Sequence, residues 1–253
     1  MKKTNLKKRI IPIILIENLQ VVSTKNFNDS RVFGNVEQTI EVFSRRDVDE
    51  IIVLDISCTK NNYSFDTKIL KMISKNTMMP FAYGGGIKTL ADIEKCLKNG
   101  CDKVVINNYI RKNDNFLSNA INEFGKQAIT VSMDYYSKNN KYYIYDHAIS
   151  KKTNIKLFDY LKSINKVGCG EIIVTSIDAD GLLKGYNLNP IKTIRNIVDF
   201  PIIVNGGCGS PEHMLKAFKS EADACGAGSI FYHTQNSYGD VKNYLKKNKV
   251  NVR

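Results

Sequence analysis

The segment Pro80-Phe-Ala-Tyr-Gly-Gly-Gly-Ile87 decides the fold, because a similar segment, Pro201-Ile-Ile-Val-Asn-Gly-Gly-Cys208, follows 121 residues later. Each copy joins a short apolar run to glycines and precedes a helical pattern. The same displacement of 121 residues relates Glu50-Ile-Ile-Val53 to Glu171-Ile-Ile-Val174. A constant displacement over several strands predicts that the chain consists of two duplicated halves.

The rest of the chain repeats this strand-then-helix pattern about every 25 to 40 residues. Such alternation is typical of parallel strands joined by crossover helices. Eight pairs in 253 residues favour an α/β protein with a closed (βα)8 TIM barrel, made of two (βα)4 halves in one domain, residues 1–253. No G-x-G-x-x-G follows the first strand, which disfavours a dinucleotide-binding sheet. The expected strands are Arg9–Ile16, Ile51–Ile56, Pro80–Tyr83, Lys103–Asn107, Ala128–Asp134, Glu171–Ile177, Pro201–Asn205 and Ala222–Gly226.

Composition excludes several other classes of protein. A hydrophobic content of 43% is enough for a packed core, and no apolar run reaches the roughly 18 residues of a membrane span. The lysine-rich start precedes a run too short for a signal peptide, so we expect a cytoplasmic protein. The net charge of +12 comes from scattered lysines. We therefore expect no nucleic-acid partner, and the charge suits either a solvated surface or a phosphorylated substrate.

Cysteine and histidine usage argues against a metal centre. The six cysteines form no C-x-x-C pair, and the three histidines, His147, His213 and His233, lie far apart in the sequence. We therefore expect free thiols in a reducing compartment, with no metal and no cofactor.

Glycine-rich loops follow several of the expected strands, at the end of the barrel where active sites of this fold lie. Glycine lets the backbone approach an anion, and the helix N-terminus that follows adds positive potential. Because the loops are duplicated, we expect a substrate with a phosphate at each end. The alternative is that these glycines only form tight turns. The predicted phosphate-binding residues are Gly85, Gly86, Asn107, Gly206, Gly207, Gly228 and Ser229.

Carboxylates also stand at these strand ends, namely Asp55, Asp134, Asp178 and Asp180. Carboxylates in such places transfer protons or bind sugar hydroxyls. Alone, each is more often a helix cap or a surface charge.

Motifs along almost the whole chain resemble the cyclase subunit of imidazole glycerol phosphate synthase. The resemblance implies ammonia addition to a bis-phosphorylated ribulosyl aminoimidazole carboxamide. A bound glutaminase subunit would supply the ammonia through the barrel, in a heterodimer. On the same basis we expect Asp180 and Gly181 to contact the substrate. The motifs are Arg9-Ile-Ile-Pro12, Leu54-Asp-Ile56, Tyr83-Gly-Gly-Gly-Ile87, Asp102-Lys-Val104, Ile106-Asn107, Phe124-Gly125, Gly170-Glu-Ile172, Thr175-Ser-Ile-Asp178, Asp180-Gly181, Lys184-Gly-Tyr186 and residues 244–252.

The resemblance also implies a ring of charges that closes the bottom of the barrel and gates ammonia. The matching residues are Arg9, Glu50, Lys103 and Glu171, all at strand starts. Four charges that sum to zero can pair with one another, although such a ring could also be a structural plug. Next to it, Asp102 resembles the carboxylate that docks the glutaminase.

At the top of the barrel the resemblance is weaker. The family has two catalytic aspartates, and only Asp134 is present, because Leu15 stands at the other position. Ser23 occupies the place of a loop lysine, with Lys25 two residues later, and Leu182 replaces a phosphate-binding threonine. A leucine cannot relay a proton, and such help is worth roughly 10²–10⁴-fold in rate.

Three hypotheses follow from this pattern. The first is an ammonia-dependent synthase subunit in amidino-sugar or surface-glycan biosynthesis, where a third protein, an amidotransferase, could receive the ammonia. The Leu15 position and the loop around Lys25 resemble that branch of the family. The second is a histidine-pathway cyclase that tolerates Leu15. The third is a non-catalytic scaffold or ammonia channel.

Overall fold

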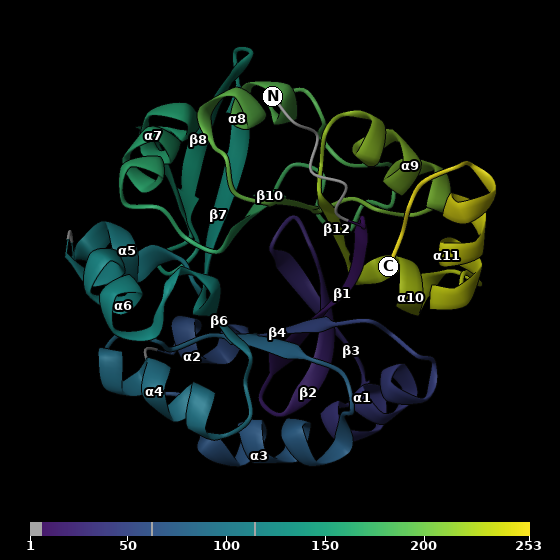
Figure 1. The fold of residues 1–253 in the computed structure, drawn as a ribbon, viewed down its shortest axis with the longest axis horizontal. Helices are drawn as coiled ribbons and strands as arrows, with labels where there is room; N and C mark the ends of the chain where they lie inside the picture. Colours follow the sequence, from purple (N-terminus) through teal and green to yellow (C-terminus); the bar gives the residue numbers. More distant parts are fainter. Residues whose placement is uncertain (1–6, 62, 114) are drawn as a thin grey trace.

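The computed structural model describes residues 7–61, 63–113 and 115–253. Within these residues eight parallel strands close into a barrel, in the order β1, β4, β5, β6, β7, β10, β11, β12 and back to β1. The helices surround the strands, as Figure 1 shows. The expectation of a (βα)8 barrel is therefore confirmed.

Each of the eight expected strands is present, with ends that differ by up to a few residues. The largest difference is at the fifth strand, which runs past Asp134 into a hairpin. The barrel strands are β1 (Arg9–Glu17), β4 (Ile51–Asp55), β5 (Phe81–Gly84), β6 (Lys103–Ile106), β7 (Ile129–Lys138), β10 (Glu171–Ser176), β11 (Ile202–Asn205) and β12 (Ala224–Ala227).

The strand register repeats the displacement seen in the sequence. Ile51 of β4 pairs with Phe81 of β5, and Ile172 of β10 pairs in the same way with Ile202 of β11. Both partners of the second pair are 121 residues beyond those of the first. The two halves of the barrel therefore share hydrogen-bond register as well as sequence.

The helices follow the amphipathic segments. Thr89 caps its helix in a reciprocal capping box with Asp92, and Pro211 opens another helix at its first position. None of the helices in the described residues is long and apolar enough to cross a membrane. The helices are α1 (Val36–Arg45), α2 (Ile56–Lys60), α3 (Thr67–Asn76), α4 (Leu90–Lys98), α5 (Asn108–Lys112), α6 (Phe116–Phe124), a 3-10 turn (Lys126–Ala128), α7 (Leu157–Val167), α8 (Ile191–Ile197), α9 (Pro211–Lys219), α10 (Ser229–His233) and α11 (Tyr238–Lys247).

Apolar side chains pack in two regions because the strands are buried on both faces. The larger region lies between the strands and the helices. The smaller one fills the barrel interior. Its members are Ile11, Ile13, Ile52, Ala82, Val105, Ile173, Ile203 and Ala224, with Leu15 and Leu54 packed against them.

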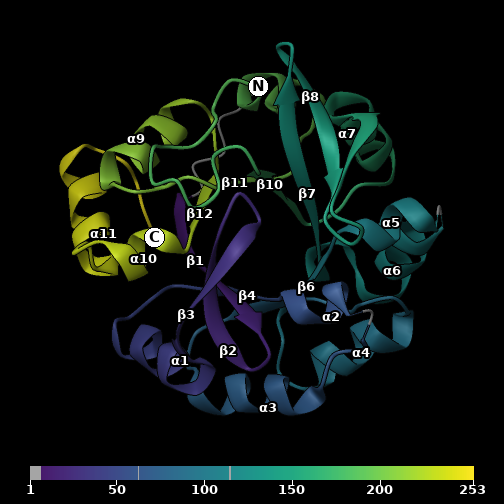
Figure 2. The same cartoon turned by 180° about the vertical axis from the view of Figure 1, so that it is seen from behind.

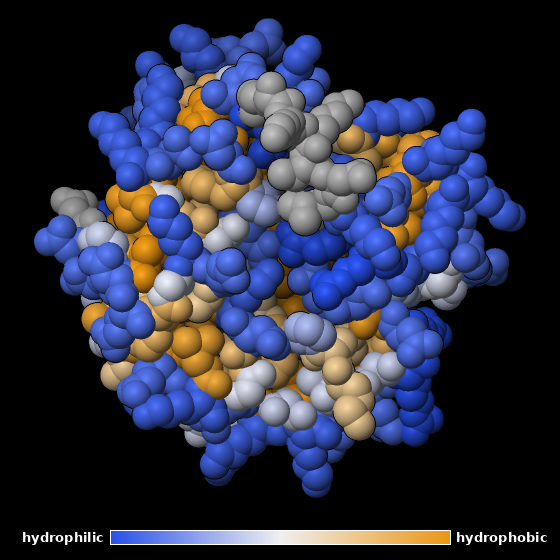
Figure 3. All heavy atoms as spheres, viewed as in Figure 1, coloured by the Kyte–Doolittle hydropathy of each residue, from blue (hydrophilic) through white to orange (hydrophobic). Residues whose placement is uncertain are grey.

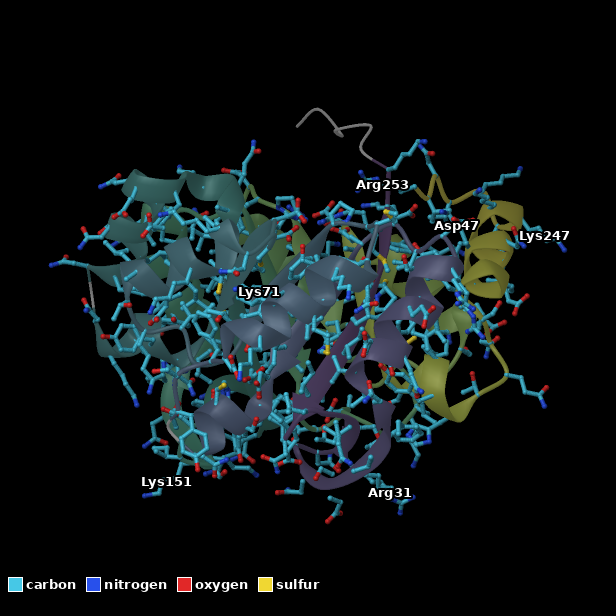
Figure 4. The ribbon with its side chains drawn as sticks, turned by 90° about the horizontal axis from the view of Figure 1, so that it is seen from below. Arg31, Asp47, Lys71, Lys151, Lys247 and Arg253 are labelled. Atoms are coloured by element: carbon cyan, nitrogen blue, oxygen red, sulfur yellow. The ribbon has the colours of Figure 1, made fainter. Side chains whose placement is uncertain are left out.

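Two antiparallel hairpins extend from the barrel and were not expected from the sequence. The first consists of β2 (Gln20–Lys25) and β3 (Asn28–Asn35), and it continues β1. The second adds β8 (Lys141–Asp146) and β9 (Lys151–Lys156) to β7. Both project from one end of the barrel in Figure 2. Figure 4 shows Arg31 and Lys151, one on each hairpin, at the end opposite Arg253.

Candidate functional site

A cavity opens at the barrel end that carries the two hairpins, and we call it the mouth cavity. Residues at the C-terminal ends of several barrel strands line it, including Gly85, Asn107, Asp134 and Thr175. Phe27 of the first hairpin and Tyr145 of the second line it as well. The two rings meet edge to face, with centroids 6.2 Å apart. The hairpins therefore partly cover the cavity.

Asp134 is a buried carboxylate of this cavity, with 4% of the residue exposed. Asn107 Nδ2 donates to its Oδ2 over 2.8 Å. His147 Nδ1 lies 2.7 Å from the same oxygen. Asn107 was expected at this site, whereas His147 comes from the second hairpin and was not. The structure thus places an imidazole, an amide and a carboxylate side by side.

Asp180 lies beside this cluster, partly buried under the first hairpin. Thr24 Oγ1 donates to its Oδ2 over 2.8 Å, and the Phe27 backbone N–H donates to the same oxygen over 3.4 Å. Burial raises the pKa of Asp180 to about 6, helped by the negative charge of Asp134 and opposed by the two hydrogen bonds. The carboxyl is therefore poised to change its charge in mildly acidic solution.

Strand register places Leu15 at the position equivalent to Asp134. Leu15 pairs with Leu54 on β4, and Asp134 pairs with Thr175 on β10. Leu54 and Thr175 are themselves 121 residues apart and so equivalent in the two halves. Leu15 also lines the mouth cavity. Leu15 therefore gives this part of the cavity an apolar surface.

The glycine loops are divided between two cavities. Gly85 and Gly86 line the mouth cavity with Asn107, whereas Gly228 and Ser229 line a smaller cavity beside it. Asp180 lines both. Tyr232 also lines the smaller cavity, and its hydroxyl is buried with no hydrogen-bond partner among the described residues. A ligand that extends across Asp180 would contact both loops.

Three of the predicted binding residues line neither cavity: Gly181, Gly206 and Gly207. Gly181 has a φ of +70°, and an added Cβ would lie 2.1 Å from the Thr24 carbonyl oxygen. Glycine is therefore needed there for the first hairpin to pack closely. The Gly207 carbonyl accepts from the Gly185 N–H over 2.8 Å. In this structure both positions serve packing between loops.

The other carboxylates at the strand ends have local structural roles. Asp55 caps α2 by accepting from the Ser57 and Cys58 backbone N–H groups. Asp178 accepts from the Ser137 N–H over 2.6 Å and is exposed. Asp55 is thus a helix cap and Asp178 a surface charge, which are the two alternatives that the sequence left open for a lone carboxylate.

The loop positions that depart from the family pattern also differ in environment. Ser23 is 8% exposed, lines the smaller cavity, and lies 3.1 Å from His233 Nε2 through its hydroxyl. Lys25 is exposed and lines neither cavity. Leu182 lies in the segment after β10 and also lines neither. Lys88 and Lys112 are the lysines that line the mouth cavity among the described residues.

At the opposite end of the barrel, the four charged residues meet and form a ring, which we call the charged ring. Arg9 contacts Glu50 over 3.1 Å and Glu171 over 2.7 Å. Lys103 contacts Glu171 over 2.8 Å and Glu50 over 3.9 Å. The side chains are 6% to 28% exposed. Figure 3 shows this end of the molecule, with hydrophilic residues over its centre and hydrophobic patches between the surrounding helices.

The directions of the pKa shifts of Arg9 and Glu171 favour the ionised form of each side chain. Burial alone would raise the pKa of Glu171, but Arg9 and Lys103 outweigh it and hold that pKa below its ordinary value. Burial alone would lower the pKa of Arg9, and Glu171 and Glu50 raise it instead. Each charge therefore depends on its neighbours.

Asp102 stands at the edge of this end and is exposed. Its Oδ2 accepts from the Phe81 backbone N–H over 2.9 Å. Asp223, its equivalent in the second half, accepts from the Ile202 N–H over 3.0 Å. The repeated contact shows that this aspartate caps the start of the neighbouring strand, while its exposed side remains accessible.

Comparison with known proteins agrees with this architecture. A family model described as histidine biosynthesis protein matches residues 9–237. The imidazole glycerol phosphate synthase subunit HisF of Hydrogenobaculum sp. strain Y04AAS1 is 38% identical over 98% of this chain and 99% of its own length. The chain belongs to the HisF family of histidine biosynthesis proteins. A Campylobacter jejuni relative, provisionally named imidazole glycerol phosphate synthase subunit hisF2, is 37% identical over 98% of this chain and 99% of its own length. A Vibrio vulnificus relative with the same provisional name is 36% identical over 98% of this chain and 92% of its own.

Membership of the HisF family confirms the resemblance inferred from the motifs. The sequence also predicted which strand ends meet, but it missed His147, Thr24 and Tyr145, which the hairpins bring to the cavity. Alternating tyrosines in Lys141-Tyr-Tyr-Ile-Tyr-Asp146 were the available signal for the second hairpin. Among the described residues, no group of three or more His, Cys, Asp or Glu side chains is placed to hold a metal ion.

Proposed function

We propose that this HisF-family chain is the synthase subunit of a glutamine-dependent amidotransferase, and that it adds ammonia to a small phosphorylated substrate in the mouth cavity. The observation that carries the proposal is the combination of a complete charged ring at one end with a buried, hydrogen-bonded Asp134 at the other. The apolar barrel interior between them would conduct a neutral molecule such as ammonia. The site of action would be the cytoplasm.

The glutaminase partner would dock at the charged ring. In the closed arrangement, the four paired side chains would block water and ions. A change of pairing partners within the ring would open a path for ammonia. The rim offers both kinds of contact that a partner requires. Asp102 presents an exposed carboxylate, and Met78, just before β5, is 99% exposed. An apolar side chain beside a charge suits a stable protein interface.

In the mouth cavity, the phosphates would be bound at the two glycine loops. Gly85, Gly86 and Asn107 would take one phosphate, and Gly228 and Ser229 the other. Asp180 lies between them and would bind hydroxyl groups of the substrate. Gly206 and Gly207, just after β11, line neither cavity and would instead pack against the end of β10 and the segment that follows it. Asp134 would serve the proton transfers.

The apolar side chain of Leu15 favours a substrate other than the bis-phosphorylated carboxamide of the histidine pathway. With one of two equivalent carboxylates replaced by an apolar side chain, the cavity has lost a proton-transfer group. We therefore propose a role in amidino-sugar or surface-glycan biosynthesis, with ammonia or an aminated product passed to an amidotransferase. The hisF2 relatives and this chain are similar as members of one family, and this similarity does not identify the compound that accepts the ammonia. A histidine-pathway cyclase is the second candidate, favoured by the retained Asp134 and Asn107.

Co-expression with a glutaminase subunit of an imidazole glycerol phosphate synthase tests the proposal. The two proteins should co-elute in size-exclusion chromatography, in the presence or absence of a glutamine analogue. Glutamine should then support amination, and free ammonium salt should do so without the partner. If the proteins never co-elute, the ammonia-channel proposal fails and a scaffold role replaces it. Growth complementation of a strain that lacks the histidine-pathway cyclase separates the two candidate pathways.

A further inference from the structure

Among the described residues, His147 is the one histidine that lines the mouth cavity, and the second hairpin contributes it. It follows β8 directly, and its side chain is 27% exposed, compared with 6% for Asp134. Its Nδ1 lies 2.7 Å from Asp134 Oδ2. The contact crosses from the hairpin to the barrel wall, so the histidine sits over the carboxylate and faces the cavity.

The contact to Asp134 constrains which nitrogen of the imidazole carries a proton. An ionised carboxylate only accepts hydrogen bonds, so Nδ1 must carry the proton that it shares with Asp134. Asn107 Nδ2, 2.8 Å from the same oxygen, is a second donor to it. A neutral histidine with its proton on Nδ1 has a free electron pair on Nε2. The structure therefore presents a base that a buried carboxylate orients from behind.

The turn that carries His147 is held firmly. Asp146, the preceding residue, pairs with Arg111 over 2.8 Å, with side chains 12% and 9% exposed. Asn108 Nδ2 donates to Asp146 Oδ1 over 2.9 Å, and the Ala148 N–H donates to it over 3.1 Å. Both Asn108 and Arg111 belong to α5, which begins immediately after Asn107. One short helix thus fixes the histidine and the amide that share Asp134.

The position equivalent to Asp134 in the first half of the barrel is Leu15, so the cavity has one of the two carboxylates that the family resemblance implies, with an imidazole bound to it. We infer that His147 Nε2 is the group that exchanges protons with the substrate, and that Asp134 is the positioning residue behind it. This inference rests on the proposed function, because it assigns an acid–base group to the same cavity. It changes the role that the family resemblance gives to Asp134.

The proton transfer balances without any further reactant. The electron pair of ammonia forms a C–N bond to a carbonyl carbon of the substrate, and the π pair of the C=O bond moves to oxygen. The new ammonium group passes one proton to His147 Nε2. The resulting imidazolium is balanced by the charge of Asp134 and returns the proton to the alkoxide. The product is a neutral carbinolamine, and the histidine ends in its starting state.

The state of His147 can be measured without any substrate. In ¹⁵N-labelled protein at pH 8, two-bond proton–nitrogen spectra report the tautomer of each histidine, and His147→Asn assigns the signal. We expect the Nδ1–H form. In Asp134→Asn the amide can donate to Nδ1, so the population should shift towards the Nε2–H form. Acylation of His147 by diethylpyrocarbonate should then slow at least 5-fold, with His213 and His233 as internal references. A predominant Nε2–H tautomer in the unaltered protein would overturn the inference.

Turnover distinguishes proton transfer from a structural contact. The probe is the bis-phosphorylated ribulosyl aminoimidazole carboxamide with excess ammonium chloride. His147→Asn keeps a donor near the Nδ1 position, so it preserves the contact to Asp134. We expect kcat to fall about 100-fold or more, with KM nearly unchanged. A kcat within about 3-fold of the unaltered protein would show a structural role and refute the inference. If the unaltered protein does not turn over this probe, the acceptor is another compound, as the proposed function expects, and the tautomer and acylation measurements still decide the state of His147.

Discussion

Two conservative substitutions in the charged ring should differ sharply in cost, although both remove one negative charge. Glu171→Gln and Glu50→Gln keep the shape of the side chain. Glu171 contacts Arg9 over 2.7 Å and Lys103 over 2.8 Å, and it accepts from the Thr130 hydroxyl over 3.2 Å. Glu50 contacts Arg9 over 3.1 Å, whereas its distance to Lys103 is 3.9 Å. The two glutamates are equivalent by sequence repeat but not by their contacts.

The magnitudes follow from what each substitution leaves unpaired. Without the Glu171 charge, Arg9 and Lys103 share Glu50 alone, in a site where the Arg9 side chain is 16% exposed. Breaking a buried pair from one side costs about 3–5 kcal/mol, and glutamine keeps one hydrogen bond, so we expect about 3 kcal/mol of lost stability. Without the Glu50 charge, both cations keep Glu171 at short distance. That loss should be about 1 kcal/mol.

The pH dependence provides an internal check. Since the pKa of Glu171 is below its ordinary value in the folded chain, its contribution to stability is present at neutral pH. That contribution is lost as pH falls below about 4.5 and through the folded-state pKa, because the unfolded chain takes up the proton first. The difference between the unaltered protein and Glu171→Gln should therefore be largest near pH 7 and shrink below about pH 4.5.

Urea unfolding at several pH values, followed by circular dichroism, gives these free energies. The double variant Arg9→Met with Glu171→Gln is the matched control, since it removes both members of the shortest Arg9 pair. It should be less destabilised than the sum of the two single changes. Equal losses for Glu171→Gln and Glu50→Gln, or a loss below about 0.5 kcal/mol for Glu171→Gln, would refute the argument from unpaired charge.

Three further predictions concern the cavities. Crystals soaked in phosphate should show an anion beside Gly85, Gly86 and Asn107, beside Gly228 and Ser229, or at both; density at neither, in high phosphate, would contradict a bis-phosphate substrate. Leu15→Asp should raise turnover of the bis-phosphorylated carboxamide with ammonium salt about 10-fold or more, and no gain would mean that the cavity has been adapted to another acceptor. Because the pKa of Asp180 is raised to about 6, its protonated form stabilises the fold. The quantity to compare is the free energy of unfolding of the unaltered protein minus that of the Asp180→Asn variant. This difference should fall by at most about 3 kcal/mol as pH rises from about 4 to about 6. A flat difference in urea titrations would show that Asp180 is not buried in solution.

The barrel and its polarity could be predicted from the sequence because they depend on local patterns. Apolar runs before glycines give strands, and the constant displacement of 121 residues shows that the pattern is duplicated. Parallel strands have all their C-terminal ends on one side, so the chain order alone placed Gly85, Asn107 and Asp134 at the mouth. By the same rule Arg9 and Glu171 had to lie together at the other end. These predictions require only the direction of each strand.

The tertiary structure decided what lies above the barrel and how the residues divide between two cavities. The outer strands of the hairpins, β3 and β9, contain polar and charged residues with little apolar periodicity, so no sequence pattern predicts where the hairpins lie. Their placement depends on contacts between distant segments, such as Thr24 with Asp180 and Phe27 with Tyr145. The pairing of His147 with Asp134 depends on an antiparallel turn that brings residue 147 back over β7. A sequence pattern fixes which residues face a strand end, whereas only packing fixes which loop residue comes within 2.7 Å of them.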